Sequence, residues 1–290
     1  MAGLFYEYYL RGYRGAGIRA MHTDGSKRGR RERWHEDPRP ARLLKAIIAL
    51  KSANLPSLKE ILADYKQRFG SEVELMSMEI QRERLIFQIG HDRYTISLMP
   101  AAIPWLELEG PCALAWYWPK ATISMQSHTA HLIITSETQE LPNDALSRVM
   151  DLTKLTASAA AVSDSVGVYW DAGGVVQEAQ EFVFSAEEMS RDDLPLNLWI
   201  DFRIEDAPGE RFRLFTTGMR PFGHREIEVR PAKVNPDEIL STAFNVASYL
   251  LINGPVIKDG DTIGATDDER MLVQYGPSMF EREQVMILRM

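Results

Sequence analysis

Residues 43–70 read LLKAIIALKSANLPSLKEILADYKQRFG, an apolar run followed by an amphipathic one. The run from Leu43 to Leu50 is short and has proline upstream and polar residues downstream, which is typical of a buried strand. Ser57 and Glu60 have the spacing of a capping box, which marks the start of a helix. Glycine closes many helices, so we expect this helix to end at Gly70. The stretch therefore predicts a strand followed by a helix.

More strands and a second helix are expected before residue 140. Apolar residues alternate or cluster at strand length in three places, and Gly90, His91 and Asp92 supply a hairpin turn between the last two. These strands are 72–80, 85–89 and 94–99. A helix at 111–125 and a strand at 130–135 follow. The order strand, helix, two strands, helix, strand predicts a ferredoxin-like half with helices on one face of a mostly antiparallel sheet.

The remaining chain predicts a second α+β half. Its first helix runs over 144–162, and its second runs over 235–252, with Asn235 as the N-cap and Pro236 at the first helical position. The expected strands are 166–170, 175–184, 198–204, 212–217, 227–230, 270–274 and 284–288. We thus expect two halves, 43–140 and 141–290, packed as one unit of the α+β class. Their similar size leaves a divergent duplication open.

The charge of the chain is uneven. The 290 residues carry a net charge of −8, yet residues 1–45 hold 11 basic and 5 acidic side chains. Low apolar content at high charge predicts that the basic leader, residues 1–42, is disordered. Two interpretations stay open for it: an electrostatic arm for nucleic acid, or a dispensable extension. The composition favours the second, so nucleic acid is expected as a partner only through the leader.

Cysteine usage and hydropathy indicate the compartment. The single cysteine, Cys112, excludes an intramolecular disulfide and a zinc site made of cysteines. It has no basic neighbour in sequence, so we expect no activated thiolate. No apolar run is long enough to cross a membrane. A cytoplasmic protein that does not bind membranes is therefore expected.

Several short motifs together resemble one family. They occupy residues 97–105, 118–119, 130–135, 167–170, 194–199, 217–228 and 261–264. The longest reads TGMRPFGHREIE, and their order and spacing resemble the uncharacterised, mainly bacterial family named domain of unknown function 4261. The resemblance extends from residue 43 to the C-terminus. It implies a shared fold and a bacterial cytoplasmic setting, and it implies no activity.

The segment from Thr216 to Glu228 is the main candidate for binding. Two glycines flank MRPF in this segment, so the backbone turns sharply and can approach another surface. Charged side chains of both signs follow, which suits a polar partner or an anion. The candidate binding residues are Trp170, Thr217, Gly218, Met219, Arg220, Gly223 and His224. The alternative is a tight strand connection with ordinary solvated charges.

Catalytic and metal-binding candidates rest on the histidines. His131 and His224 are candidates for an acid or base, and the carboxylate that orients them would be Glu226, Glu228 or Asp201. His128 and His131 are close in sequence, but a metal needs further ligands and a strand would turn the two side chains apart. Packing is therefore the favoured role for this pair. The sequence predicts no metal and no cofactor, since phosphate-binding and nucleophile motifs are absent from it.

These patterns favour a non-catalytic function. The leading hypothesis is a binding or regulatory module that presents the Gly218–Glu228 loop to a protein partner or a small polar ligand, because an acidic body suits a basic partner. The alternative is a hydrolase or transferase that uses His131 or His224 with a carboxylate. Convergence of His131, Trp170, Met219 and His224 on one pocket would favour an enzyme or a ligand-binding protein, and their dispersion would favour a protein-interaction module.

Overall fold

The computed structural model describes residues 19–21, 38–70, 73–139, 144–264 and 270–290. The chain divides into two compact units. The first contains the described residues from Ala41 to Trp199. The second contains Ile200 to Met290 together with the described residues from Arg19 to Pro40. The division at Trp199 differs from the predicted boundary near residue 140, because the strands that follow residue 144 join the first sheet.

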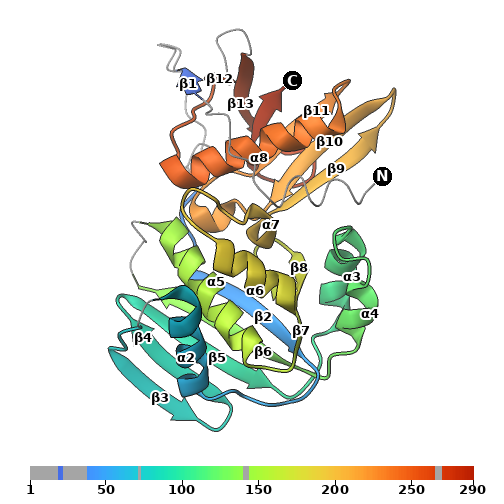
Figure 1. The fold of residues 1–290 in the computed structure, drawn as a ribbon. Coiled ribbons are helices and arrows are strands. Elements are labelled where there is room, and N and C mark those ends of the chain that lie inside the picture. The colour runs from blue at the N-terminus through green and yellow to red at the C-terminus, as the bar shows by residue number, and fades with distance from the viewer. Residues whose placement is uncertain (1–18, 22–37, 71–72, 140–143, 265–269) are drawn as a thin grey trace. The chain divides into compact units, whose positions relative to one another are not determined.

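The first unit is built on a seven-stranded antiparallel sheet (Figure 1). Its order is β3-β4-β5-β6-β2-β7-β8, so the apolar strand β2 lies between β6 and β7. The strands are β2 (Leu43–Leu50), β3 (Ser77–Gln81), β4 (Arg84–Ile89), β5 (Asp92–Met99), β6 (Ala130–Thr138), β7 (Ser165–Trp170) and β8 (Val175–Glu178). Burial of both faces of β2 explains why its sequence is a continuous apolar run rather than an alternating one.

Helices cover this sheet on both faces. Helix α5 (Ala145–Ala161) packs beside α2 (Leu58–Phe69) and α6 (Ala179–Glu188), and Figure 1 shows the three in front of the sheet. Ile47 and Ala49 of β2 share a separate core cluster with α3 (Trp105–Leu114) and α4 (Ala121–Gln126). Since successive side chains of a strand point to opposite faces, α3 and α4 cover the face opposite α5. The short helix α7 (Leu196–Trp199) ends the unit.

The predicted caps of α2 are confirmed. The Ser57 hydroxyl accepts a bond from the backbone N–H of Glu60 at 3.2 Å, and the Glu60 carboxylate accepts one from the N–H of Ser57 at 2.9 Å. Gly70 closes the helix in the left-handed conformation, with φ of 66°. Both ends of α2 thus follow from residues that were identified in the sequence.

Two elements of the first unit differ from the predictions. The segment 111–125 is not one helix: α3 ends at Leu114 and α4 begins at Ala121, with turns between them that include Pro119. The predicted strand 175–184 ends at Glu178, and α6 follows because Ala179, Phe182 and Ala186 bury one face at helical spacing. The α+β class is confirmed. The ferredoxin-like detail is not confirmed. Helices α3 and α4 connect the neighbouring strands β5 and β6, whereas α5 makes the crossover between β6 and β7.

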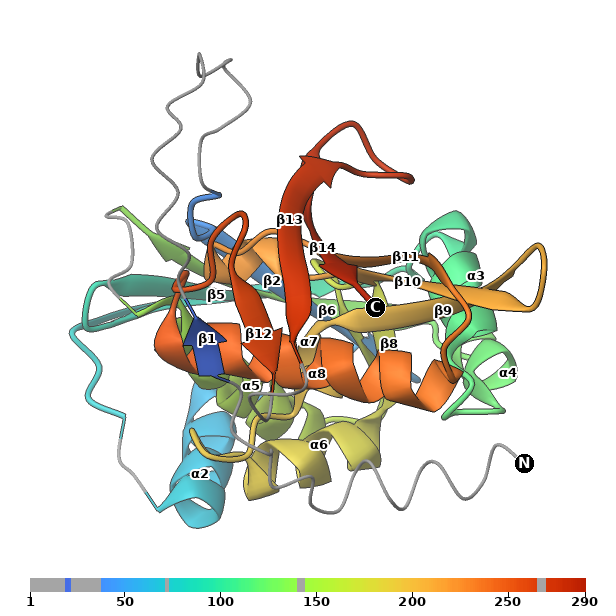
Figure 2. The same ribbon diagram turned by 90° about the horizontal axis from the view of Figure 1, so that it is seen from above.

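The second unit has its own seven-stranded sheet, in the order β1-β12-β13-β14-β11-β10-β9. Among its described strands, only β11 and β14 pair in parallel. The strands are β1 (Arg19–Met21), β9 (Asp201–Ala207), β10 (Arg211–Thr217), β11 (Ile227–Ala232), β12 (Thr262–Gly264), β13 (Met271–Pro277) and β14 (Gln284–Arg289). Helix α8 (Pro236–Asn253) packs on β9, β10 and β11, as Figure 2 shows, and Asn235 caps it as predicted.

The basic leader is only partly described. Arg19–Met21 form β1 and pair antiparallel with β12, so these residues correct the prediction of a leader without structure. Residues 1–18 and 22–37, which include most of the basic cluster, lie outside the described residues.

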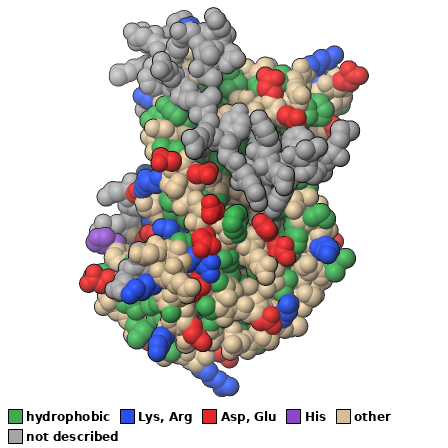
Figure 3. Space-filling model, viewed as in Figure 1, with side chains coloured by type: hydrophobic (Ala, Val, Ile, Leu, Met, Phe, Trp, Pro, Cys, Tyr) green, Lys and Arg blue, Asp and Glu red, His purple; other side chains and the backbone are tan. Residues whose placement is uncertain are grey.

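Elsewhere, acidic and basic side chains are interspersed over the face in Figure 3, and neither sign forms a continuous patch there. Among the described helices, none is long and apolar enough to cross a membrane.

Candidate functional site

The Gly218–Glu228 loop connects β10 to β11 within the second unit and is mostly buried. Residues 221–229 are all buried, and Met219 has no exposed surface. Its middle is a single 3₁₀ turn, η1 (Arg220–Phe222), closed by Gly223 with φ of 82°. A β-carbon on Gly223 would lie 2.9 Å from the ring of Pro40, so glycine is required there for space as well as conformation. The loop therefore packs inside its unit and does not present a surface.

Glu226 holds this loop together. Its carboxylate accepts hydrogen bonds from the hydroxyl of Thr216 at 2.7 Å and from the backbone N–H groups of Gly218 and Met219, both at 3.0 Å. Burial raises the pKa of Glu226, and these hydrogen bonds act in the opposite direction. Because the lone pairs of Glu226 accept these hydrogen bonds, its carboxylate stabilises its own loop and is not available to orient a histidine.

The other charged side chains near the loop also have partners within the second unit. Glu228 accepts hydrogen bonds from the hydroxyl of Ser278 and the backbone N–H of Met279, and pairs with Arg230 at 3.1 Å. Arg220 pairs with Glu281 at 3.4 Å and also with Glu283. The predicted alternative for this segment, a tight strand connection, matches the packing, although its charges are mostly buried rather than solvated.

The two histidines proposed as acids or bases form no hydrogen bond with a carboxylate of the described residues. Burial lowers the pKa of His224 to about 4, which leaves a neutral ring at neutral pH. His131 donates through Nδ1 to the carbonyl of Ala101 at 2.7 Å, and burial lowers its pKa as well. Among the residues that the structure describes, no ion pair joins a histidine to a carboxylate. The geometry of these two histidines does not support acid–base catalysis.

His128 has both ring nitrogens occupied. Its Nε2 accepts a hydrogen bond from the backbone N–H of Ile103 at 2.7 Å, so its Nδ1 carries the proton and donates to the carbonyl of Met125. These bonds fasten the residues before α3 to the end of α4. Over the described ranges, no group of three or more histidine, cysteine or acidic residues could hold a metal ion.

Trp170 and Cys112 are packing residues of the first unit. Trp170 is buried and stacks on Phe182 with ring centroids 6.5 Å apart. Cys112 is buried in the cluster beneath α3 and α4, and this burial raises the pKa of its thiol to about 11. His131 and Trp170 belong to the first unit, whereas the other candidate binding residues belong to the second. Each group is accounted for by contacts within its own unit.

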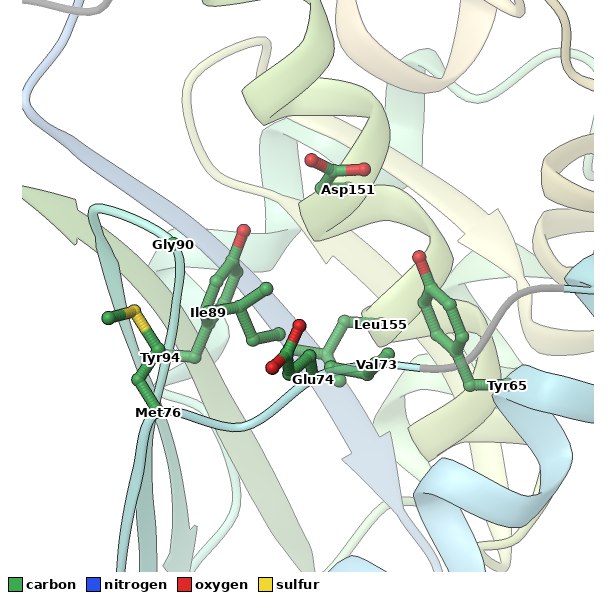
Figure 4. A pocket seen from close by; sticks show the side chains of 9 residues that line it. All are labelled: Tyr65, Val73, Glu74, Met76, Ile89, Gly90, Tyr94, Asp151 and Leu155. Carbon is green, nitrogen blue, oxygen red and sulfur yellow. The ribbon is translucent and has the colours of Figure 1, made fainter.

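A pocket of about 370 Å³ lies elsewhere in the first unit (Figure 4). Tyr65 of α2 and Tyr94 of β5 stand on opposite sides of it, and Leu155 of α5 lies between them. Two carboxylates, Glu74 and Asp151, complete its polar lining. The remaining lining residues are Val73, Met76, Ile89 and Gly90. Apolar and aromatic walls with a few polar groups are the usual make-up of a small-molecule site.

The two tyrosine rings are held in place by phenylalanines. Tyr65 meets Phe69 edge to face with centroids 5.1 Å apart, and Tyr94 stacks on Phe87 with centroids 5.7 Å apart. Both tyrosines are buried except where they border the pocket. In Figure 4 their hydroxyl groups point to the same side as the Asp151 carboxylate. Packing against neighbouring rings therefore positions both tyrosines without a ligand.

Negative charge gathers at this pocket. Asp151 is open to solvent on one side, but the surrounding protein desolvates its carboxyl and raises its pKa, and repulsion from Asp92 and Asp144 adds to the rise. Lys154 and Arg191 act in the opposite direction. Lys154 lies over the ring of Phe69 at 5.7 Å, and Arg191 is bonded to Asp144. Asp151 and Glu74 form no hydrogen bond or ion pair with any described residue.

The pocket was missed in the sequence because its residues are scattered. They come from α2, the segment after it, the turn between β4 and β5, and α5, and they share no motif. One signal was available: Asp151 is a charged residue of a predicted helix, and its two neighbours in sequence, Met150 and Leu152, are apolar. That pattern places the carboxylate at the edge of the core without revealing what faces it.

Comparisons with known proteins reach only part of the chain. Searches of curated proteins and of solved structures found no match. Residues 215–289, which include the Gly218–Glu228 loop and most of the second unit, match the model of the family described as "Domain of unknown function (DUF4261)", which confirms the resemblance over this C-terminal segment.

Proposed function

We propose that the protein is a non-catalytic binding module whose first unit takes a cationic group into the pocket between Tyr65 and Tyr94. The observation that carries this proposal is a pair of carboxylates, Asp151 and Glu74, that form no hydrogen bond or ion pair with a described residue and lie beside two packed aromatic rings. A cation in this position would interact with both carboxylates, offset one of their two negative charges and lie against the electron-rich ring faces. The ligand would be a small amine or guanidine, or the basic side chain of a protein partner.

The proposal keeps the class of function expected from the sequence and moves its site. The Gly218–Glu228 loop was expected to meet the ligand, but its charged groups are bound to one another and to the backbone. A cationic ligand also agrees with the net charge of −8, which attracts basic partners over a distance set by the salt concentration. A cytoplasmic setting remains part of the proposal.

An NMR titration tests this function. The probe is N-acetyl-arginine amide, and N-acetyl-citrulline amide serves as its neutral isostere. We expect the arginine compound to shift resonances of residues 73–76 and 89–94 and of α5 around Asp151, and the citrulline compound to leave them unchanged. Asp151→Asn or Glu74→Gln should each weaken binding about fivefold, as expected for a charge contact of about 1 kcal/mol.

Glu109→Gln is the matched control, because Glu109 is an exposed carboxylate of the same unit outside the pocket. It should bind the arginine compound as the wild type does. Equal resonance shifts with the arginine and citrulline compounds would reject a charge-selective pocket. A loss of affinity in Glu109→Gln as large as in the pocket variants would also reject it.

A further inference from the structure

Strand β3 is the end strand of the first sheet, and no described strand pairs with its outer edge. It pairs with β4 on one side only, and all five of its residues are exposed. Natural proteins protect such edges with lysine, proline, bulges or covering elements, because the unpaired backbone groups can bind another strand. Its sequence, SMEIQ, contains neither lysine nor proline and has one charged residue, Glu79, and its pairing with β4 is unbroken from Ser77 to Gln81.

An exposed apolar stripe runs along this strand. Met76, Met78 and Ile80 are 67%, 57% and 62% exposed, and alternate spacing places all three on one face of the sheet. Ile80 lies opposite Leu85 of β4, which in turn lies opposite Ile96 of β5. Exposure falls along this row from 62% to 3% and then to 0%. The apolar face that packs inside the unit therefore continues onto β3, where no described element covers it.

The stripe leads into the pocket. Met78 lies opposite Phe87, and Phe87 lies opposite Tyr94, so the stripe and the tyrosine wall share a face of the sheet. Met76 belongs to both features, since it lines the pocket as well as the stripe. The acidic groups thus lie at one end of the stripe, and Ile80 lies at the other.

From this continuity we infer that β3 receives an extended peptide of a partner protein, which adds to the sheet as a further strand. This inference rests on the proposed function and names its ligand: a segment with apolar residues at alternate positions and a basic side chain at the Met76 end. The backbone would pair with β3, the apolar residues would cover Met78 and Ile80, and the basic group would enter the pocket.

Charge distinguishes this partner from a second copy of the chain. Two β3 strands side by side would bring Glu79 of each copy, and the nearby Glu74, towards the same edge. Like charges across paired strands are destabilising. A basic peptide without acidic residues removes that repulsion and fills the pocket. A second copy that brought its own Arg82, the residue after β3, to the Met76 end would still place Glu79 opposite Glu79.

Fluorescence polarisation with labelled peptides tests the inference. The probes alternate valine and threonine and carry one arginine, at either end because the strand direction is open, with citrulline versions as controls. Ile80→Glu should weaken binding of the arginine peptide about tenfold and leave N-acetyl-arginine amide binding unchanged, since Ile80 lies outside the pocket. Ile123→Glu, at a 75% exposed site on α4, should change neither. Hydrogen exchange at residues 77–81 should slow when the arginine peptide binds.

The outcomes separate the two proposals. Wild-type affinity in Ile80→Glu, or unchanged exchange in β3, would overturn docking at the strand while leaving the pocket intact. A wild-type dimer in analytical ultracentrifugation that Ile80→Glu dissociates would also overturn it, because the edge would then receive a second copy. Failure of the arginine compound, with exchange in β3 still slowed by the peptide, would reject the pocket and support docking at the strand.

Discussion

Buried polar side chains of the β10–β11 turn act on the backbone of their own loop. Glu226 is the clearest case, because it satisfies two N–H groups that would otherwise have no partner inside the second unit. His224 is buried two residues before it and stays neutral. The stability of this turn therefore depends on which groups carry charge.

Replacing Glu226 should destabilise the second unit. Glu226→Ala leaves the N–H groups of Gly218 and Met219 unpaired, so we expect the free energy of unfolding to fall by about 2–4 kcal/mol. Glu226→Gln keeps one acceptor and should cost less. Urea denaturation measures both, and Glu178→Gln, at an exposed site, serves as the control. An alanine variant as stable as the wild type would show that water replaces the Glu226 carboxylate as the acceptor for these N–H groups.

His224 should make stability depend on pH. Its pKa is about 4 in the folded protein against an ordinary value of 6.5, so the unfolded chain binds more protons between these values. Stability from this group is then complete above pH 6.5 and falls as the pH drops towards 4, by up to about 3 kcal/mol. His224→Phe should flatten that part of the profile, whereas His91→Gln, at an exposed site, should not. Parallel profiles for wild type and His224→Phe would contradict this assignment.

At the scale of elements, Arg148 connects α5 to three strands. Its guanidinium donates to Asp92 of β5 at 2.9 Å, to the carbonyl of Ser136 in β6, and to the carbonyls of Ala41 and Arg42 at the entry to β2. Arg148→Met leaves a half-buried carboxylate and several carbonyls without a donor, so we expect a loss of about 3–5 kcal/mol in thermal unfolding. Asp92→Asn removes the charge that Arg148→Met leaves without a partner. The double variant should therefore lose less stability than the two single variants combined. Additive losses would show that the pair is not coupled.

Adjacent glycines in the β7–β8 turn should respond differently to alanine. A β-carbon on Gly173 would lie 2.2 Å from the carbonyl oxygen of Trp199 in α7, whereas one on Gly174 would meet nothing within 4 Å. Gly173→Ala should therefore displace α7 and cost about 1–3 kcal/mol. Gly174→Ala should cost about 1 kcal/mol, for its positive φ alone. Equal melting temperatures for the two variants would contradict the close approach of α7.

Local signals predicted the elements that have local causes. Ser57, Glu60 and Gly70 determine the ends of α2, and Asn235 and Pro236 determine the start of α8. The division of residues 111–125 into two helices does have a local signal that the prediction did not use, because Pro119 cannot continue a helix. The packing of both helices beneath β2 and β7 has none. Strands β1 and β12 are three residues long and are defined only by their pairing, so no periodicity could indicate them.

For the whole molecule, the α+β class was predictable and the site was not. The class follows from the alternation of helix and strand patterns along the chain. The pocket assembles when α2, α5 and the β4–β5 turn come together, and its carboxylates are ordinary surface residues in the sequence. The predicted loop showed charges and glycines, but tertiary packing buried them. The residue type alone could not distinguish a carboxylate that binds its own loop, such as Glu226, from one that lines a pocket, such as Asp151.

The pKa of Asp151 tests the acidic pocket most directly. Carboxyl-carbon NMR, assigned with Asp151→Asn, should show a pKa above the ordinary value of 3.8 in the free protein. A bound cation stabilises the charged carboxylate, so saturating N-acetyl-arginine amide should lower that pKa, and affinity should rise with pH as Asp151 ionises. The citrulline compound should leave the value unchanged. An Asp151 pKa that is the same with and without the arginine compound would contradict the proposed cation site.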